Sequence, residues 1–429
     1  MALSRKNKLL KIYLFVTIYS NALRIVFGKW ATILADIILL LILAYVLFAQ
    51  NFGKIRFNKS LRYIMGAIVL LQILSIVGIS NGNITNKLYG LVEYRKSVFQ
   101  IMCFFLAYYC SDNEKFWNNL EFTEWLVVPT ILYGIKQTLF YSRFDSIFYR
   151  LQDAGADTLQ YRGVRRAISI YSGPFHFGMM CSIILCVAIA LLIKTNKKRN
   201  ILVIILCLFG SYCSLTRTNI VCSFIVLSIY GMHILTEDTT VQSLLRKLIM
   251  LATVLIIAGW FVVEYSSLLD NKNSVALLIN SILNMGDDNR FIGRIDTWTI
   301  ALEMIKQRPI WGYGMGAAGD TLVSYGVAIK SVTPHNIFIK LQIETGILGL
   351  ILLIIILINA WYICIKKSYG LERSFFWSCF AVVILNGLVG STISTFPIMS
   401  LFWIFIGMQA SKKNLSNTEV RCEKNSSYY

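Results

Sequence analysis

The sequence has 429 residues, of which 56% are hydrophobic and only 15% are charged. Soluble domains carry roughly 45–50% apolar and about 25% charged residues, so this composition excludes a set of soluble domains. A mean hydropathy of +0.63 instead indicates a membrane protein surrounded by membrane lipids. The net charge of +19 would suggest a nucleic-acid partner for a soluble protein. In a membrane protein this charge bears on the orientation of the loops, so we expect no nucleic-acid partner.

Apolar runs long enough to cross a bilayer as helices recur along the whole chain. Crossing needs about 20 predominantly apolar residues, and on this measure we predict about 12 transmembrane helices. The predicted segments are residues 12–27, 31–50, 63–80, 97–110, 122–141, 173–193, 201–215, 218–235, 248–265, 337–363, 375–393 and 396–410. Because lipid offers no partner to unpaired backbone groups, these segments predict an all-α, polytopic inner-membrane protein.

Lys and Arg in the short loops predict how the chain is oriented in the membrane. With the N-terminus in the cytoplasm, the cytoplasmic loops hold 22 of the 41 basic residues. These loops are residues 1–11, 51–62, 111–121, 194–200, 236–247, 366–374 and 411–429. We therefore expect both termini inside and two longer loops, 142–172 and 266–336, outside. The chain then divides into helices 1–9 (1–265), the long late outer loop with short helices (266–336), helices 10–12 (337–410) and a cytoplasmic tail (411–429).

Arginines mark two places on the predicted outer side. Loop 142–172 has a net charge of +2 and contains the adjacent Arg165 and Arg166. Arg217 lies in a polar break, residues 214–219, between two apolar runs. An ionisable residue near lipid is costly and usually faces a cavity or a partner. We therefore favour a functional Arg217 over an arginine that only extends to the membrane surface.

The long outer loop contains a predicted helix, residues 290–307, with three functional candidates on one face. Arg290, Arg294 and Trp298 follow one another at intervals of four residues. Arg is a bidentate donor to phosphate, so two guanidiniums and an indole in one line suit a phosphate beside a sugar ring. The alternative is a solvated helix in which Arg290 pairs with a neighbouring aspartate and Trp298 lies at the membrane interface.

The chain has three histidines, and they suggest different roles. His335 opens the span after the long outer loop, where an imidazole with an ordinary pKa of ~6.5 is suited to proton transfer. His176 opens a span at the outer face and fits packing and substrate contact equally well. His233 lies near the cytoplasmic end of a span and is interpreted as structural. No spacing typical of a metal site occurs, so we expect neither metal nor cofactor.

Residues 314–319 match the pattern GxGxxG but do not predict a dinucleotide site. No strand precedes them, and they lie in the predicted outer loop. We expect these glycines to form a turn in which the backbone approaches a ligand or another helix.

Several ordered pieces of the sequence resemble the bacterial O-antigen ligase/polymerase superfamily. The pieces are Thr216-Arg217-Thr218, Arg290-x3-Arg294-x3-Trp298, Arg308-Pro309-Ile310-Trp311-Gly312-Tyr313-Gly314, His335-Asn336-x-Phe338 and Glu344-Thr345-Gly346-Ile347-Leu348-Gly349-Leu350. The first departs from the family pattern, with Thr in a Ser position. The resemblance covers roughly residues 214–220 and 290–350, and the first half of the chain offers only a similar arrangement of spans.

The resemblance implies an inverting glycosyltransferase that works at the outer face of the inner membrane. Its donor would be a glycan on undecaprenyl pyrophosphate, and its charge stabilisation would need no metal. Arg217 and Arg290 would neutralise the departing pyrophosphate, and His335 would orient or deprotonate the acceptor hydroxyl. The substrate-binding residues would be Arg294, Trp298, Asn336, Arg165 and Arg166. A flippase and a chain-length regulator would be partners.

Four functions compete. We favour a polymerase of O-antigen or capsule repeat units, and the nearest alternative is a ligase that transfers finished glycan to lipid A core. A polysaccharide flippase or transporter is the alternative that is not an enzyme, but the internal repeats and midplane polar sites common in transporters are not evident. A metal-dependent membrane glycosyltransferase would place acidic residues in a large first outer loop, whereas that loop here is about residues 28–30.

Overall fold

The computed structural model describes residues 2–28, 30–49, 59–81, 87–111, 115–151, 160–161, 164–236, 289–318 and 332–412. Within these ranges the regular structure is helical, apart from one antiparallel pair of two-residue strands. Six of the helices are long and apolar enough to cross a membrane. The predicted all-α, polytopic membrane fold is therefore confirmed.

The first third of the chain forms helices only. In chain order these are α1 (Ala2–Phe27), α2 (Trp30–Ala49), α3 (Lys59–Asn81), α4 (Lys87–Lys96), the 3₁₀ helix η2 (Val98–Met102), α5 (Cys103–Cys110) and α6 (Phe116–Leu139). The predicted segment 97–110 is thus a 3₁₀ turn followed by a short helix rather than one long helix. Gln72 of α3 explains part of this difference, because its Nε2 donates to the carbonyl oxygen of Val98 at 2.9 Å.

The middle of the chain contains the strands and the most deeply buried helix. Its elements are α7 (Asp145–Leu151), β1 (Gln160–Tyr161), β2 (Val164–Arg165), α9 (Pro174–Thr195), α10 (Arg199–Cys213) and α11 (Arg217–Thr236). Proline at the first position suits the start of α9, and Asn196 in the left-handed conformation ends it. In the most apolar 18-residue stretch of α9, 83% of the residues are buried. The corresponding share in the other five candidate spans is 33–50%, so α9 is the central helix.

The last part of the chain begins with the helix of the long loop. Its elements are α14 (Asn289–Gln307), α16 (Ile337–Lys366), α17 (Gly370–Val389), the 3₁₀ helix η5 (Thr392–Ser394) and α18 (Ile398–Ser411). The helix predicted over residues 290–307 is confirmed by α14. Helices are found in every predicted membrane segment except 248–265, which lies outside the described residues.

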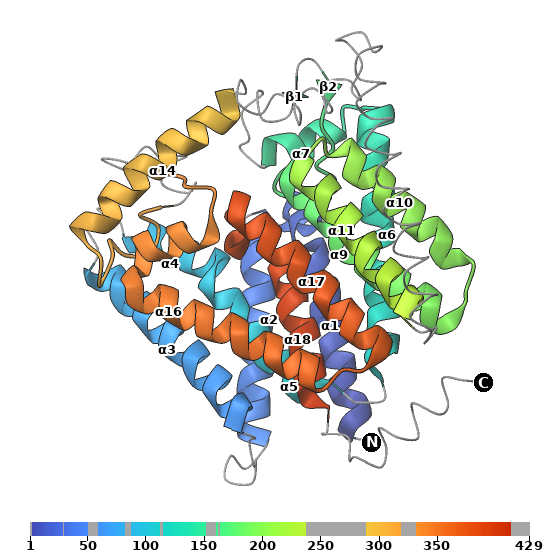
Figure 1. Ribbon diagram of the computed structural model, residues 1–429, viewed down its shortest axis with the longest axis horizontal. Coiled ribbons are helices and arrows are strands. Elements are labelled where there is room, and N and C mark those ends of the chain that lie inside the picture. Colours follow the sequence, from blue (N-terminus) through green and yellow to red (C-terminus); the bar gives the residue numbers. More distant parts are fainter. Residues whose placement is uncertain are drawn as a thin grey trace.

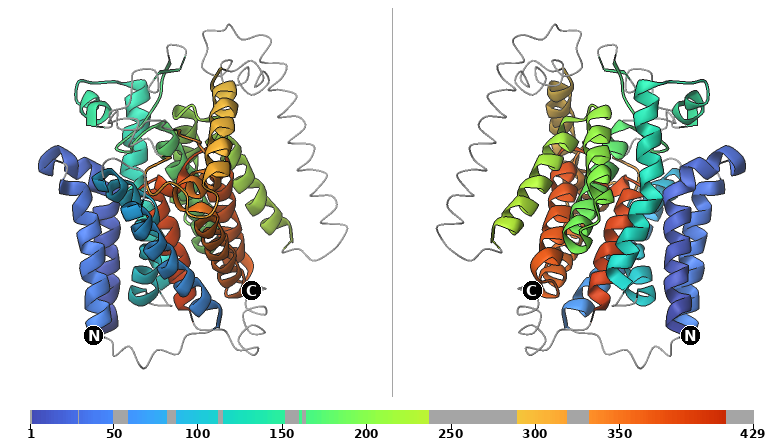
Figure 2. Two further views of the ribbon diagram at one scale, coloured as in Figure 1. Left: turned by 90° about the vertical axis from the view of Figure 1, so that its left-hand side faces the viewer. Right: turned by 90° about the vertical axis from the view of Figure 1, so that its right-hand side faces the viewer.

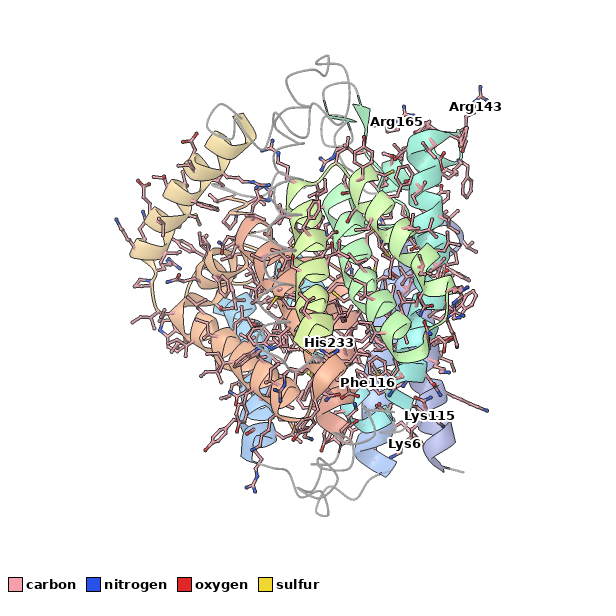
Figure 3. All side chains as sticks on the ribbon, turned by 45° about the vertical axis from the view of Figure 1, so that its right-hand side comes forward. Lys6, Lys115, Phe116, Arg143, Arg165 and His233 are labelled. Atoms are coloured by element: carbon pink, nitrogen blue, oxygen red, sulfur yellow. The ribbon has the colours of Figure 1, made fainter. Side chains whose placement is uncertain are left out.

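Most of the helices run side by side, and α7, β1, β2 and α14 lie at one end of the molecule (Figures 1 and 2). We call the end that carries α7, β1, β2 and α14 the loop end, and the end that carries the start of α1 the opposite end. Figure 3 shows Arg143 and Arg165 at the loop end, and Lys6 and Lys115 at the opposite end.

Loops that the charge pattern assigns to one side of the membrane meet at the opposite end. Asn119 at the start of α6 donates its Nδ2 to Oδ1 of Asn7 at 2.9 Å and contacts Sδ of Met408 at 3.7 Å. Lys412, after α18, pairs with Glu372 at 2.6 Å. These contacts bring together parts of the predicted loops 1–11, 111–121, 366–374 and 411–429. The spatial grouping agrees with the predicted orientation, which itself stays a prediction.

Candidate functional site

Arg217 is the first residue of α11, directly after a break between two helices. α10 ends at Cys213, and Leu215 in the break has a φ of +48°, which lies in the left-handed region. The amide of Asn219 donates to the carbonyl oxygen of Thr216 at 3.1 Å and starts α11. The N-terminus of a helix carries a partial positive charge, so the half-buried Arg217 adds its cation to a position that already favours anions.

The start of α9 lies against this break. Asn219 donates its Nδ2 to the carbonyl oxygen of Phe175 at 3.0 Å, in the first turn of α9. Gly178 allows this approach, because a Cβ there would lie 2.5 Å from Nδ2 of Asn219 and 2.6 Å from Oγ of Ser214. His176, in the same turn, is half-buried and lies edge-on to Phe175. The starts of α9 and α11 are therefore held together.

His335 is exposed and directly precedes the start of α16. Its φ of +45° is an uncommon backbone conformation that histidine tolerates better than most residues. The next residue, Asn336, caps the helix: its Oδ1 accepts from the amides of Phe338 and Ile339 at 2.9 and 3.1 Å. Its Nδ2 donates to the carbonyl oxygen of Leu388 at 3.0 Å. The predicted substrate-binding amide of Asn336 is thus used to fix the backbone next to His335.

A continuous set of contacts joins the neighbourhoods of Arg217 and His335. Leu388, which accepts from Asn336, lies near the end of α17. Gly390 follows α17, and a Cβ on it would lie 2.5 Å from the Phe175 ring at the start of α9. The starts of α9, α11 and α16 therefore border one region of the loop end, and each contributes the positive end of a helix dipole.

α14 is attached beside His335 through Trp298. The indole Nε1 of Trp298 donates to the carbonyl oxygen of Pro334, the residue before His335. Ala301 of α14 and Ile343 of α16 also belong to one small apolar cluster, which is separate from the main core. Arg294, one turn before Trp298, is half-buried, and Arg290 lies in the first turn of α14. The face predicted to carry Arg290, Arg294 and Trp298 is thus anchored next to the histidine.

Arg165 and Arg166, adjacent in the sequence, contact different parts of the loop end. The guanidinium carbon of Arg165 lies 3.6 Å from the centre of the Tyr141 ring. Arg166 instead donates to the helix break: its Nε lies 3.1 Å from the carbonyl oxygen of Ser214, and its Nη2 lies 3.1 Å from Oγ1 of Thr216.

Asp145 is the acidic residue of loop 142–172 that the structure describes, and the charge of its side chain is compensated by a lysine within the protein. Asp145 at the start of α7 is fully buried and accepts from Oη of Tyr133 at 2.7 Å and Nζ of Lys136 at 2.6 Å. Burial alone would raise the pKa of this carboxyl, but hydrogen bonds from Lys136, Tyr133 and Ser142 outweigh burial and lower its pKa. The exposed charge in the described part of this loop therefore comes from arginines such as Arg143.

Two comparisons with known proteins match this chain. A family model described as O-antigen ligase matches residues 201–354. An O-antigen polymerase of Salmonella muenchen is 24% identical over 213 residues, which cover 49% of this chain. The chain spans about half the length of that relative, 50% of which is matched. Both matches support the O-antigen ligase/polymerase superfamily.

The stretch matched by the O-antigen ligase model contains most of the predicted site. Six predicted site residues lie within it, namely Arg217, Arg290, Arg294, Trp298, His335 and Asn336. Arg165 and Arg166 lie before it. The structure therefore connects a stretch with the superfamily match to a loop outside that match, through the contact of Arg166 with the helix break.

Two glycine-containing segments that include pieces of the superfamily pattern, residues 308–316 and the break in α16, contact each other through their backbones, which sequence reasoning missed. We call this contact the interlock. α16 is broken at Gly346, which has φ +69° and ψ −170°. The amide of Tyr313 donates to the carbonyl oxygen of Ile343 at 2.8 Å, and the amide of Ile347 donates to that of Pro309 at 2.8 Å. Gly316 donates its amide to Oε1 of Glu344 at 3.0 Å. The expected turn at residues 314–319 is thus found over its described part, 314–318, and its backbone approaches another helix.

A buried ion pair was also missed. Lys340 of α16 pairs with Glu93 of α4, and Nζ of Lys340 lies 3.3 Å from Oγ of Ser394 in η5. Little in the sequence indicates this pair, because Glu93 lies close to Arg95 and Lys96, and Lys340 lies in the predicted membrane segment 337–363. No group of three or more His, Cys, Asp or Glu side chains suited to a metal occurs in the part of the chain that the structure describes.

Proposed function

We propose that this protein is a polysaccharide polymerase that joins O-antigen or capsule repeat units at the outer face of the bacterial inner membrane. Its donor is a growing glycan on undecaprenyl pyrophosphate, and its acceptor is a second lipid-linked repeat unit. The observation that carries the proposal is the convergence of Arg217, His335 and the arginine-bearing α14 at one end of the bundle. The superfamily match and the name of the Salmonella relative support the substrate class.

The chemistry of the donor explains why a basic site is needed. Substitution at the anomeric carbon sends an electron pair onto the pyrophosphate, whose negative charge grows as the bond breaks. Arg217, Arg290 and Arg294 stabilise this charge, together with the start of α11. Bidentate guanidinium groups suit phosphate oxygens and replace the metal ion that other glycosyltransferases use.

His335 acts on the acceptor. As the acceptor oxygen bonds to the anomeric carbon, its proton passes to the imidazole of His335. The new bond forms on the face opposite the departing pyrophosphate, so the configuration at this carbon is inverted. Asn336 holds the backbone of His335, while Trp298 and Arg165 contact the glycan. A flippase that delivers repeat units and a chain-length regulator are the proposed partners.

The ligase is the second candidate, and the description of the matching family model favours it. Polymerase and ligase use the same donor and differ in the acceptor, which for the ligase is lipid A core. The polymerase is our first choice because the curated relative is named a polymerase.

The test is the phenotype of His335→Ala in cells that make the lipopolysaccharide. We expect a rate loss of ~10²-fold or more, as for removal of a general base. A polymerase that fails leaves lipid A core capped with a single repeat unit, because export and ligation continue. A ligase that fails leaves uncapped core and long glycan on the lipid carrier.

Two matched controls separate chemistry from folding. His233→Asn changes a histidine at the opposite end, and Arg143→Ala changes an exposed arginine at the loop end; both should keep the wild-type ladder. Arg217→Ala and Arg290→Ala should abolish product at normal protein levels. An unchanged ladder in His335→Ala would contradict both enzymatic functions and favour a transporter.

A further inference from the structure

Arg166 holds the helix break that precedes Arg217 and is partly withdrawn from solvent. Its side chain is half-buried, and two of its nitrogens are donors to the break, one to the carbonyl oxygen of Ser214 and one to Oγ1 of Thr216. The amide of the next residue, Ala167, donates to the carbonyl oxygen of Cys213 at 2.9 Å. Residues 166 and 167 therefore supply donors to the carbonyl groups of Ser214 and Cys213, at a helix end that leaves such groups without helical partners.

The segment that presents Arg166 is itself firmly built. Residues 167–171 are buried, and Ser169 has a left-handed φ of +56°. Gln137 of α6 spans the turn, because its Oε1 accepts from the amide of Ser169 at 2.7 Å and its Nε2 donates to the carbonyl oxygen of Ser169 at 3.1 Å. Tyr149 of α7 donates its hydroxyl to the carbonyl oxygen of Arg166 at 2.8 Å. We call residues 166–171 the strap.

The strap determines where α11 can begin. Thr216, whose hydroxyl receives Arg166, also accepts the first backbone hydrogen bond of α11 through its carbonyl oxygen. The left-handed Leu215 lies between the two residues that Arg166 contacts. A displacement of this break would move Arg217, the next residue, relative to the starts of α9 and α16.

We infer that Arg166 is a positioning residue for Arg217 and not a contact of the lipid-linked glycan. The inference rests on the proposed function, in which Arg217 stabilises the departing pyrophosphate. A guanidinium reaches both acceptors from fixed directions, whereas a single ammonium cannot reproduce that geometry. Arg166→Lys therefore keeps the charge and loses the positioning.

The first experiment measures the geometry without any substrate. Hydrogen–deuterium exchange of the full-length protein in detergent micelles should be faster at residues 213–220 in Arg166→Ala and Arg166→Lys. Exchange at the start of α16 should not change. Arg143→Ala is the control, because Arg143 is a neighbouring exposed arginine that makes no contact with the break among the described residues. This variant should exchange as the wild type does. Unchanged exchange at residues 213–220 in both Arg166 variants would overturn the inference.

The second experiment is a kinetic double-mutant cycle with purified protein and a lipid-linked repeat unit. Arg166→Lys should lower kcat by about 10-fold and change KM for the donor by less than about 3-fold, because transition-state charge stabilisation is lost. In an Arg217→Lys background the same change should cost less than about 2-fold, since both act through one interaction. Thr216→Val removes one acceptor of Arg166 and should also lower kcat.

The outcomes separate this inference from the proposed function. Equal losses from Arg166→Lys in both backgrounds, or a loss confined to KM, would assign Arg166 to substrate binding and overturn the inference. If wild-type protein transfers no glycan, the proposed function fails, while the exchange experiment still decides whether Arg166 holds the break.

Discussion

Lys340 and Glu93, 247 positions apart in the chain, form an ion pair whose two side chains are each only 3% exposed. The pair joins the first part of α16 to α4. Lys340 lies five residues after His335, so the pair fixes the start of the helix that follows the candidate histidine. Taking either charge out of water costs several kcal/mol by itself, and each charge is kept in place by the other.

Removal of the ammonium group should therefore destabilise the protein. Lys340→Met should lower the free energy of unfolding by about 3–5 kcal/mol, because the carboxylate of Glu93 is left buried without its cation. Glu93→Gln in addition should recover part of the loss. Thermal unfolding in micelles measures both, with Lys366→Met, an exposed lysine at the end of the same helix, as the control. A Lys340→Met protein as stable as the control would contradict the structural role.

The break in α16 should not tolerate a side chain. Gly346→Ala puts a Cβ 2.0 Å from the carbonyl oxygen of Ile310 and requires a backbone conformation that is available almost only to glycine. The conformational term alone costs about 1–3 kcal/mol, and the steric conflict adds to it. Gly66→Ala is the control, because no atom outside its own helix lies within 4 Å of the added Cβ. The measurement is the yield of folded protein and its Tm. Equal values for the two variants would exclude the interlock.

The loop end should lose stability in acid through Asp145. The pKa of Asp145 is lower in the folded protein than the ordinary aspartate value of about 3.9. Its stabilising contribution is therefore complete above pH ~4 and is lost as the pH falls through the lower folded pKa. Asp145→Asn should have a lower Tm than wild type at pH 7, and the difference should shrink below pH ~4. A difference that stays constant between pH 7 and pH 3 would show that ionisation of Asp145 is not involved.

The orientation can be measured with single cysteines at the two ends. Nine cysteines in the described part of the chain are buried thiols, so a Cys422→Ser background should react little with an impermeant maleimide. Arg143→Cys should react in intact cells, whereas Lys198→Cys should react only after the membrane is permeabilised. The reverse pattern would turn Arg217 and His335 toward the cytoplasm and remove the proposed function.

Removal of divalent metal should not affect glycan transfer by the purified protein. Arginine side chains supply the positive charge in the proposed reaction, so excess EDTA should not change the rate of glycan transfer. The readout is the product ladder with a lipid-linked repeat unit, with and without added Mg²⁺. Strong inhibition that Mg²⁺ reverses would contradict the role given to the arginines.

Apolar length and local polarity were enough to predict much of this architecture. Lipid forces a 20-residue apolar run to be helical whatever its neighbours are, so segments such as α9 and α17 could be found without tertiary information. The break around Arg217 was visible because five polar residues in the stretch 214–219 interrupt two apolar runs. The helix predicted over residues 290–307, with Arg290, Arg294 and Trp298 at intervals of four residues, is found as α14 (Asn289–Gln307).

The contacts between distant segments could not be predicted in the same way. Gly312 and Gly346 matter because two backbones touch, and no alternation of side chains marks that contact. The charge of Arg166 predicts a substrate contact, and nothing in the sequence indicates its two hydrogen bonds to the break, which depend on a strap held by α6. Glu93 has Arg95 and Lys96 beside it in its own helix, so sequence spacing gives no means of pairing it with Lys340.

The interlock of residues 308–316 with the break in α16 has a consequence for how relatives of this protein are recognised. Two pieces of the superfamily pattern, residues 308–314 and 344–350, are joined to each other by backbone hydrogen bonds. A search that relies on them selects chains with the same scaffold, whichever acceptor they use, so polymerases and ligases are retrieved together. The residues that distinguish the two enzymes should be sought among exposed side chains around the starts of α9, α11 and α16, where an acceptor must arrive.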